Sequence, residues 1–199
     1  MARLMKQAMQ TLEGQLLIAM PNMGDPRFER TVIFLCAHSR EGAMGFVINR
    51  TMDRPSIPDF LKQLNIIADG EEDTISEELR RMPLHMGGPV EPGRGFVLHS
   101  PDYRAESTLR IDEEVSLTAT LEILRAIAVG RGPRAALLTL GYSGWAGGQL
   151  EEEIVSNGWL TSSSDPELLF DPANDTKYDR ALQRLGINPS LLSGEAGHA

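Results

Sequence analysis

The side chains of this sequence that could act as nucleophile or base are few, and only one pair is closely spaced. Cys36 and His38 are two positions apart in a run typical of a β-strand, so we expect their side chains on the same face, as a thiolate-imidazole pair requires. The surrounding residues VIFLCA are apolar, and a cysteine among them is typically a small buried hydrophobe. We therefore interpret Cys36 as structural and His38, near the strand end, as the better functional candidate.

The four histidines form no recognisable metal motif. They are His38, His85, His99 and His198, and the sequence contains no H-E-x-x-H, H-x-H or C-x-x-C. His85 and His99 lie in expected strands, where a hydrogen-bonded histidine is commoner than a ligand. Only convergence of His38, His85 and His99 in space would create a metal or acid-base site, so no metal and no cofactor is expected.

Ser143 belongs to the stretch LGYSGWAGGQLEEEI at residues 140–154, which resembles a strand-to-helix turn. A nucleophile elbow needs G-x-S-x-G, but here a glycine follows the serine directly. A phosphate-binding turn is disfavoured because three glutamates at positions 151–153 would compete with an anion for the helix N-terminus. We predict a tight corner that Trp145 anchors.

Composition places the chain among soluble proteins with one compact domain. A chain of 199 residues can bury a sizeable core without disulfides, and it has a single cysteine. The N-terminus lacks a signal-peptide pattern and no apolar run is long enough to cross a membrane, so we expect a cytoplasmic protein without membrane contact. A net charge of -9 makes direct nucleic-acid binding an unfavourable interpretation.

Hydrophobic patterning predicts an α+β domain. Residues 31–39 and 44–50 are expected to pair as a hairpin, and residues 83–100 as a second one. A weak echo between residues 41–47 and 91–97 suggests that this hairpin is duplicated. The other expected elements are strands at 14–20, 107–111, 113–118, 135–140, 158–163 and 167–170, and helices that begin at Ser56 and cover 120–130, 148–157 and 174–186.

An acidic run covers residues 69–78, with six acids and no base. An oxygen-ligand calcium loop places its acids alternately around a turn glycine, and this run does not. We predict an exposed loop or a solvated helix face.

Three long stretches together resemble the AlgH/YqgE family of small bacterial proteins. They are GQLLIAMPNMGDPRFERTVIFLCAHSREGAMGFVINR, then HMGGPV with GFVLHS, and LGYSGWAGGQLEEEIVSNGWL. The resemblance implies a single α+β domain at residues 14–193, with a mixed, branching sheet that contains a small closed barrel and is surrounded by helices. Residues 1–13 are then a tail or short helix, and residues 194–199 a mobile tail.

The family has no defined biochemical activity, and part of its name comes from a proposed role in transcriptional regulation. If its motifs mark a shared binding surface, the matching positions lie mostly at strand ends and in loops, where the same residues can also fix turns and caps. These candidate residues are Asp25, Arg30, His38, Asn49, Arg50, His85, Gly87, Gly88, Trp145, Gln149 and Glu151, with Pro89 beside the glycines.

Three functions follow from these residues. Because no complete catalytic set is present, the favoured function is a non-enzymatic binding or regulatory module for a protein or small-molecule partner. We expect the protein to be monomeric. The alternative is an enzyme of unassigned class that uses a cluster of His38, His85, Cys36 and Glu151. A direct DNA-binding regulator is least favoured, since the sequence shows no helix-turn-helix signal and its net charge has the wrong sign.

Overall fold

A computed structural model describes residues 11–21 and 23–191. The expected mobile tail at residues 194–199 lies outside the described residues, as do residues 1–10 of the expected N-terminal tail or helix. The strands are β1 (Gln15–Ala19), β2 (Val32–Ser39), β3 (Gly42–Val47), β4 (Thr51–Met52), β5 (Leu84–Met86), β6 (Val90–His99), β7 (Leu109–Arg110), β8 (Ser116–Thr118), β9 (Ala136–Ala146) and β10 (Trp159–Ser163). The α-helices are α1 (Ile57–Gln63), α2 (Glu77–Arg81), α3 (Leu121–Ala128), α4 (Gln149–Val155), α5 (Pro166–Phe170) and α6 (Lys177–Arg184), and the 3-10 turns are η1 (Pro26–Phe28), η2 (Glu72–Thr74), η3 (Asn174–Thr176) and η4 (Pro189–Leu191).

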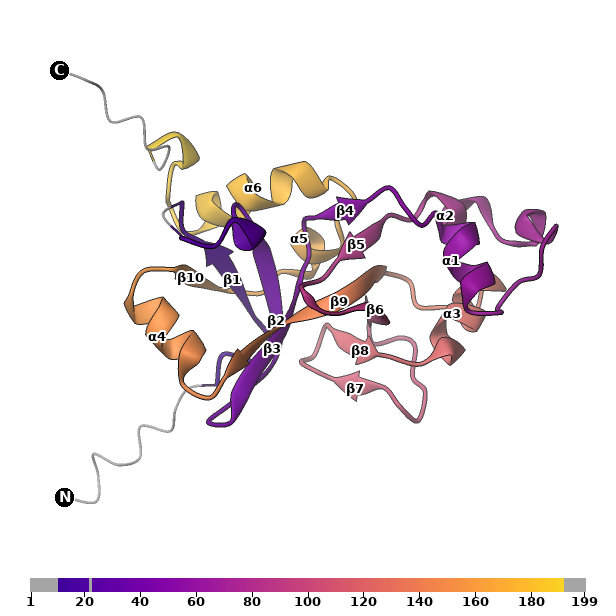
Figure 1. Cartoon of the computed structure of the whole chain (residues 1–199), viewed down its shortest axis with the longest axis horizontal. Coiled ribbons are helices and arrows are strands. Elements are labelled where there is room, and N and C mark those ends of the chain that lie inside the picture. The colour runs from indigo at the N-terminus through magenta and orange to yellow at the C-terminus, as the bar shows by residue number, and fades with distance from the viewer. Residues whose placement is uncertain (1–10, 22, 192–199) are drawn as a thin grey trace.

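The strands form one mixed sheet that branches at β9. Its main path runs β10-β1-β2-β3-β9-β6-β8-β7, and β9 also pairs in parallel with β5, which in turn pairs with β4. The long strand β9 thus crosses the middle of the molecule (Figure 1). The predicted branching sheet is present, but the predicted closed barrel is wrong: β10 and β7 end the path without meeting, because the second branch on β9 diverts the sheet into an open half-barrel.

Of the two predicted hairpins, one is confirmed and the other is wrong. β2 and β3 pair antiparallel, with Phe34 opposite Phe46. β5 and β6 do not pair with each other; they lie on opposite edges of β9, which comes some 40 residues later in the chain. The different strand pairings also rule out the duplicated hairpin. A short Gly/Pro bend between two apolar strands is typical of a hairpin, but a strand from a distant part of the chain can lie between the two strands.

A β-bulge places Cys36 and His38 on opposite faces of the sheet, so the predicted shared face is wrong. Leu35 pairs with Gly45 and Ala37 with the adjacent Met44, which leaves Cys36 as the extra residue. Cys36 packs into the core beneath α5 and α6, whereas His38 contacts α4 on the other side. Side chains alternate between the two faces along a strand, so one inserted residue moves every later side chain to the opposite face.

Among the expected helices, only the one that begins at Ser56 has a side-chain cap. Ser56 accepts a hydrogen bond from the backbone amide of Asp59 and starts α1, as predicted. The predicted strand at residues 167–170 is wrong, since Asp165 caps a helix there and Pro166 occupies its first turn. The predicted turn at residues 141–145 is also wrong, because β9 continues to Ala146 before the chain turns into α4.

Helices cover the two faces of the sheet unequally. α5 and α6 pack on a core that includes Phe34, Phe46 and Phe96, and α4 covers a smaller core around Trp145 and Trp159. α1, α2 and α3 form a separate lobe at the far end of β9 (Figure 1). The acidic run falls on η2 and the first turn of α2 in this lobe and is largely exposed, as predicted.

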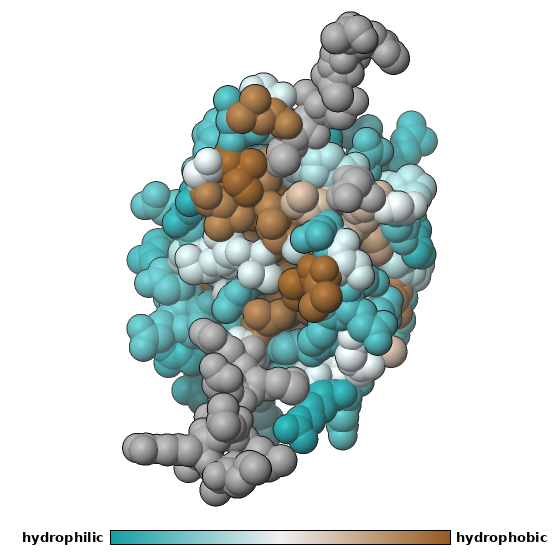
Figure 2. All heavy atoms as spheres, turned by 90° about the vertical axis from the view of Figure 1, so that its left-hand side faces the viewer, coloured by the Kyte–Doolittle hydropathy of each residue, from teal (hydrophilic) through white to brown (hydrophobic). Residues whose placement is uncertain are grey.

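The face at the α4 and β10 end of the molecule carries apolar residues among hydrophilic ones (Figure 2). Val155, the last residue of α4, is 83% exposed. Within the described residues, no helix has the length and apolar character that crossing a bilayer requires.

Candidate functional site

A hollow of about 460 Å³ opens between η1 and α4. We call it the η1–α4 hollow. One wall is the loop around η1, the other is α4 with the turn after it, and the bend at Pro89 and Val90 closes one end. Its lining residues are Met23, Gly24, Asp25, Arg27, Phe28, Pro89, Val90, Gly144, Trp145, Gln149, Glu153, Ser156, Asn157, Gly158 and Trp159.

Glu153 is the polar centre of this hollow. Its Oε2 accepts hydrogen bonds from the indole nitrogens of Trp145 at 2.9 Å and Trp159 at 2.8 Å, and its Oε1 accepts one from Nε2 of Gln149 at 3.0 Å. The two indole rings pack edge to face with centroids 6.0 Å apart, and Phe28 packs against Trp159 in the same way. Both tryptophans of the chain therefore converge on one carboxylate.

The η1 wall is held by four of the candidate residues. Asp25 caps η1 and pairs with Arg27 at 2.6 Å, and the guanidinium of Arg27 keeps the pKa of Asp25 below its ordinary value. Arg50 donates to the carbonyl oxygens of Arg27 and Glu29. The side chain of Asn49 donates to the carbonyl of Arg30 and accepts from the amide of Val32, both at 2.9 Å.

Arg30 ties the same wall to α6. Its backbone adopts a left-handed conformation with φ of 53°, which turns the chain from the loop into β2. Its guanidinium lies over the Tyr178 ring at 4.5 Å and forms an ion pair with Asp179 at 2.9 Å. These contacts fix the wall at both ends of the η1 loop.

The α4 wall is held by three further candidates. His38 accepts from the amide of Leu12 through Nδ1, and its Nε2 lies 2.8 Å from Oε1 of Glu151, so one ring joins the N-terminal segment to α4. The pKa of Glu151 is lowered, first by its own backbone amide at the start of α4 and then by His38. Gln149 accepts from the amide of Ala146 and supports Glu153, so it joins the end of β9 to α4.

Gly87 and Gly88 allow the bend to lie directly on β9. A Cβ on Gly87 would collide with Thr139 and the carbonyl of Gly141, and one on Gly88 would collide with the backbone of Tyr142 and Ser143. Ser143 is fully buried there and donates its hydroxyl to the carbonyl of Gly87 at 3.2 Å. Ser143 thus holds the bend that closes the hollow. This role is structural, although a serine in such a glycine-rich stretch could have been a nucleophile.

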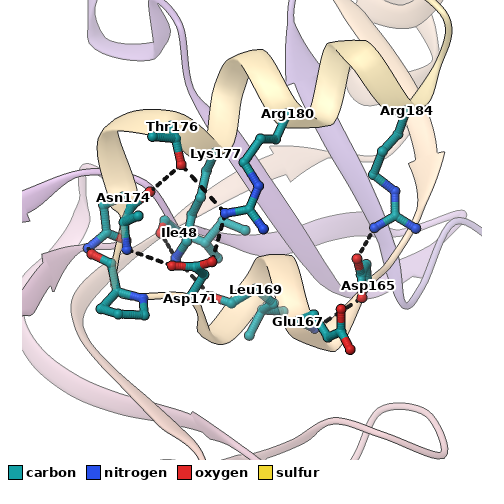
Figure 3. A network of polar contacts seen from close by, with 12 residues as sticks. Ile48, Asp165, Glu167, Leu169, Asp171, Asn174, Thr176, Lys177, Arg180 and Arg184 are labelled. Carbon is teal, nitrogen blue, oxygen red and sulfur yellow. Dashed lines mark hydrogen bonds and ion pairs between the residues drawn. The ribbon is translucent and has the colours of Figure 1, made fainter.

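His85 is the candidate that lies apart from this hollow. Its ring nitrogens are 3.1 Å from the carbonyl of Leu138 and 3.0 Å from Oδ1 of Asn174, and burial lowers its pKa. It lines a different hollow of about 440 Å³ with Lys177 and Asp171. Lys177 is fully buried and donates to the carbonyls of Ile48 and Leu169 (Figure 3).

Relatives of the chain identify its family. The sequence profile of the AlgH-like family matches residues 16–190. The chain belongs to the AlgH-like family. UPF0301 proteins of Methylobacterium sp. (strain 4-46) and Bradyrhizobium diazoefficiens are 57% and 58% identical to it over 189 residues, which is 94% of this chain and 90% and 88% of theirs.

Solved structures place its fold in the same family. The solution structure of AlgH from Pseudomonas aeruginosa is 41% identical, with a TM-score of 0.78, and the match covers 98% of this chain and 99% of that one. A crystal structure of a Corynebacterium diphtheriae protein is 19% identical and has a TM-score of 0.66, covering 93% and 91%, so it shares the fold alone. The AlgH-like resemblance noted in the sequence is thereby confirmed.

Of the four residues of the alternative enzyme site, the structure brings only His38 and Glu151 together in this AlgH-like chain, whereas His85 and Cys36 lie apart from them. His38 contacts α4, His85 contacts β9 and η3, and His99 is buried against Thr118. Burial raises the pKa of the Cys36 thiol well above its usual value, with Glu13 and Asp112 adding to the effect. No group of three or more His, Cys, Asp or Glu side chains is placed to hold a metal ion within residues 11–21 and 23–191.

Sequence patterns did not single out Glu153 and Trp159, which give the η1–α4 hollow its character. Glu153 was read only as a carboxylate near a helix N-terminus, and Trp159 only as part of a late strand. One signal was available: Trp145 and Trp159 are the only tryptophans in the chain, and the EEE run lies between them. Buried indole nitrogens usually have a hydrogen-bond acceptor, and Glu153 is an acceptor close to both in sequence.

Proposed function

We propose that this AlgH-like protein is a non-enzymatic binding module with the η1–α4 hollow as its ligand site, and that any regulatory effect it has follows from what it binds there. The observation that carries the proposal is the Glu153 carboxylate, held by two indoles and one amide at the centre of an open hollow. Hollows lined by aromatic side chains with a few fixed polar groups are typical small-molecule sites.

The lining also supports binding rather than catalysis. It includes no histidine and no cysteine, which are common as general base and as thiol nucleophile. Ten of the eleven candidate residues line the hollow or brace its walls and its closed end, which supports the interpretation of the family motifs as one binding surface. We place the protein in a reducing cytosol, in keeping with its single, buried and unbridged cysteine.

Tryptophan fluorescence tests the proposal directly, because both emitting residues line the hollow. The protein is titrated with a panel of amines, amino acids, organic acids and nucleosides, and a saturable change in emission is expected for at least one class. Gly24→Leu should weaken that change: Gly24 lines the hollow, and a Cβ there meets no atom within 4 Å, so a side chain can be added without a clash at its base.

Gly93→Leu is the matched control, since Gly93 is exposed, has open space around it and does not line this hollow. It should bind like the unmodified protein. Unchanged binding by Gly24→Leu would place the ligand elsewhere. Conversion of any panel compound into product, followed by mass spectrometry, would favour the enzyme alternative.

A further inference from the structure

Glu153 is a carboxylate without a cationic partner. Its three hydrogen-bond donors are neutral, and no Lys or Arg lies within ion-pair distance among the described residues. The other acid of the η1–α4 hollow, Asp25, is paired with Arg27. The hollow therefore carries one negative charge that the described part of the chain leaves uncompensated, and a half-buried charge of this kind favours a ligand of opposite sign.

The carboxylate also has room for one more donor. An ionised carboxylate accepts about four hydrogen bonds, two on each oxygen. Trp145 and Trp159 occupy Oε2, whereas Gln149 occupies only half of the capacity of Oε1. An N–H donor from a ligand has its place at Oε1.

A second, apolar hollow adjoins the first. It measures about 330 Å³ and shares Arg27, Phe28 and Pro89 with the η1–α4 hollow. We call it the η1–β5 hollow. Its other lining residues are Val47, Arg50, Met52, Met86, Gly88, Pro92 and Leu140. Met86 is 47% exposed, and methionine side chains adapt readily to an apolar ligand.

We propose that the ligand is an organic cation with an apolar tail. Its primary ammonium group donates to Oε1 of Glu153, and its tail passes Phe28 and Pro89 into the η1–β5 hollow. This inference rests on the proposed function and names the chemical class that the site takes. The two arginines of the η1–β5 hollow do not oppose it, because Arg27 is paired with Asp25 and Arg50 points its guanidinium at the carbonyls of η1.

Two homologous series test the proposal: n-alkylammonium ions from butyl to octyl, and the n-alkanols of the same length. Binding is followed by tryptophan fluorescence. The affinity of the ammonium ions should rise about 3-fold to 4-fold for each methylene that enters the apolar hollow. Octanol should bind at least about 10-fold more weakly than octylammonium, because it lacks the charge that Glu153 attracts.

Variants separate the two parts of the site. Glu153→Gln keeps the volume and removes the charge, so it should weaken octylammonium about 10-fold and leave octanol unchanged. Glu152→Gln removes a charge from the neighbouring exposed position of α4 and should leave both affinities unchanged. Met86→Ser should reduce the gain per methylene without removing the preference for the cation.

Any other result of these binding measurements contradicts one defined part of the proposal. Equal affinities for octylammonium and octanol, or an unchanged Glu153→Gln, would overturn the cationic class while leaving the hollow as a binding site. No dependence on chain length would overturn the apolar tail. A response to other classes of compound in the earlier panel but to neither series would overturn the proposed ligand alone, and no response to any compound would overturn the proposed function as well.

Discussion

Glu153 and Lys177 are opposite solutions to the same problem. Each is a single charge at least partly withdrawn from water, and each is satisfied by neutral groups: Glu153 by two indoles and an amide, Lys177 by the carbonyls of Ile48 and Leu169. Lys177 is sealed, with no exposed surface, between α5, α6 and the end of β3 (Figure 3). Glu153 faces an open hollow.

The difference separates a structural charge from a charge that is available for binding. Lys177 joins segments that are 129 and 8 residues away in the chain, and its burial lowers its pKa to about 8. Its side chain lies at the wall of the hollow beside His85, but it has no exposed surface and donates to two backbone carbonyls. Glu153 keeps one acceptor position free, so its charge can attract a ligand while the fold stays closed.

Removal of the Lys177 side chain should produce the largest loss of stability. Lys177→Ala leaves a cavity and two buried carbonyls without donors, and we expect the free energy of unfolding to fall by about 3 kcal/mol. Lys177→Met, which retains most of the stem, should lose about half as much. Urea unfolding followed by circular dichroism measures both values.

The half-exposed ion pair of Lys62 with Glu72 provides the control, because Lys62→Ala should have a much smaller effect. If Lys177→Ala lost no more stability than Lys62→Ala, the sealed charge would not be structural and the contrast with Glu153 would collapse.

The pKa of Lys177 predicts a stability that rises with pH in a defined window. Its folded value of about 8 lies below the ordinary 10.5, so between these values the unfolded chain binds a proton that the folded chain has released. Stability relative to Lys177→Met should therefore increase by about 2 kcal/mol between pH 8 and pH 9.5. The comparison with the variant cancels groups that titrate in both proteins.

Chemical unfolding of the unmodified protein and of Lys177→Met between pH 8 and pH 9.5 measures this difference in stability. A difference in stability that stays constant or falls with pH would show that the Lys177 ammonium is not penalised by its burial.

Glu153→Gln should have the smallest effect on stability. Glutamine still offers an oxygen to the indoles of Trp145 and Trp159, and the hollow admits water to any unpaired group. We expect a loss below about 1 kcal/mol in urea unfolding. A loss as large as that of Lys177→Ala would mean that Glu153 is as structural as Lys177, and the proposed ligand site would lose its main support.

Local signals in the sequence predicted much of the fold. Ser56 starts α1 because its hydroxyl replaces a missing helical acceptor, and this requires only the neighbouring residues. The pairing of β2 with β3 follows from a short connection. The branching of the sheet could not be derived in this way, because β9 meets its three partner strands through contacts between distant segments.

The candidate site residues also fall into those that could be expected from the sequence and those that depend on contacts between distant segments. Asp25, Asn49 and Arg50 were expected from a family resemblance, and the structure shows that they hold the η1 wall. His85 could not be separated from them in sequence, since the orientation of its ring depends on Asn174, 89 residues away. The bulge at Cys36 escaped prediction because one extra residue leaves no mark in an apolar run.

The η1 wall and the α4 wall come from segments more than a hundred residues apart, and each is fixed by its own set of contacts. Apart from Phe28, which packs on Trp159, substitutions in the η1 loop can therefore reshape one side of the hollow while the Glu153 side stays intact, and the reverse also holds. This arrangement gives the family a means of diversification: members can exchange one half of a recognition surface and inherit the other unchanged.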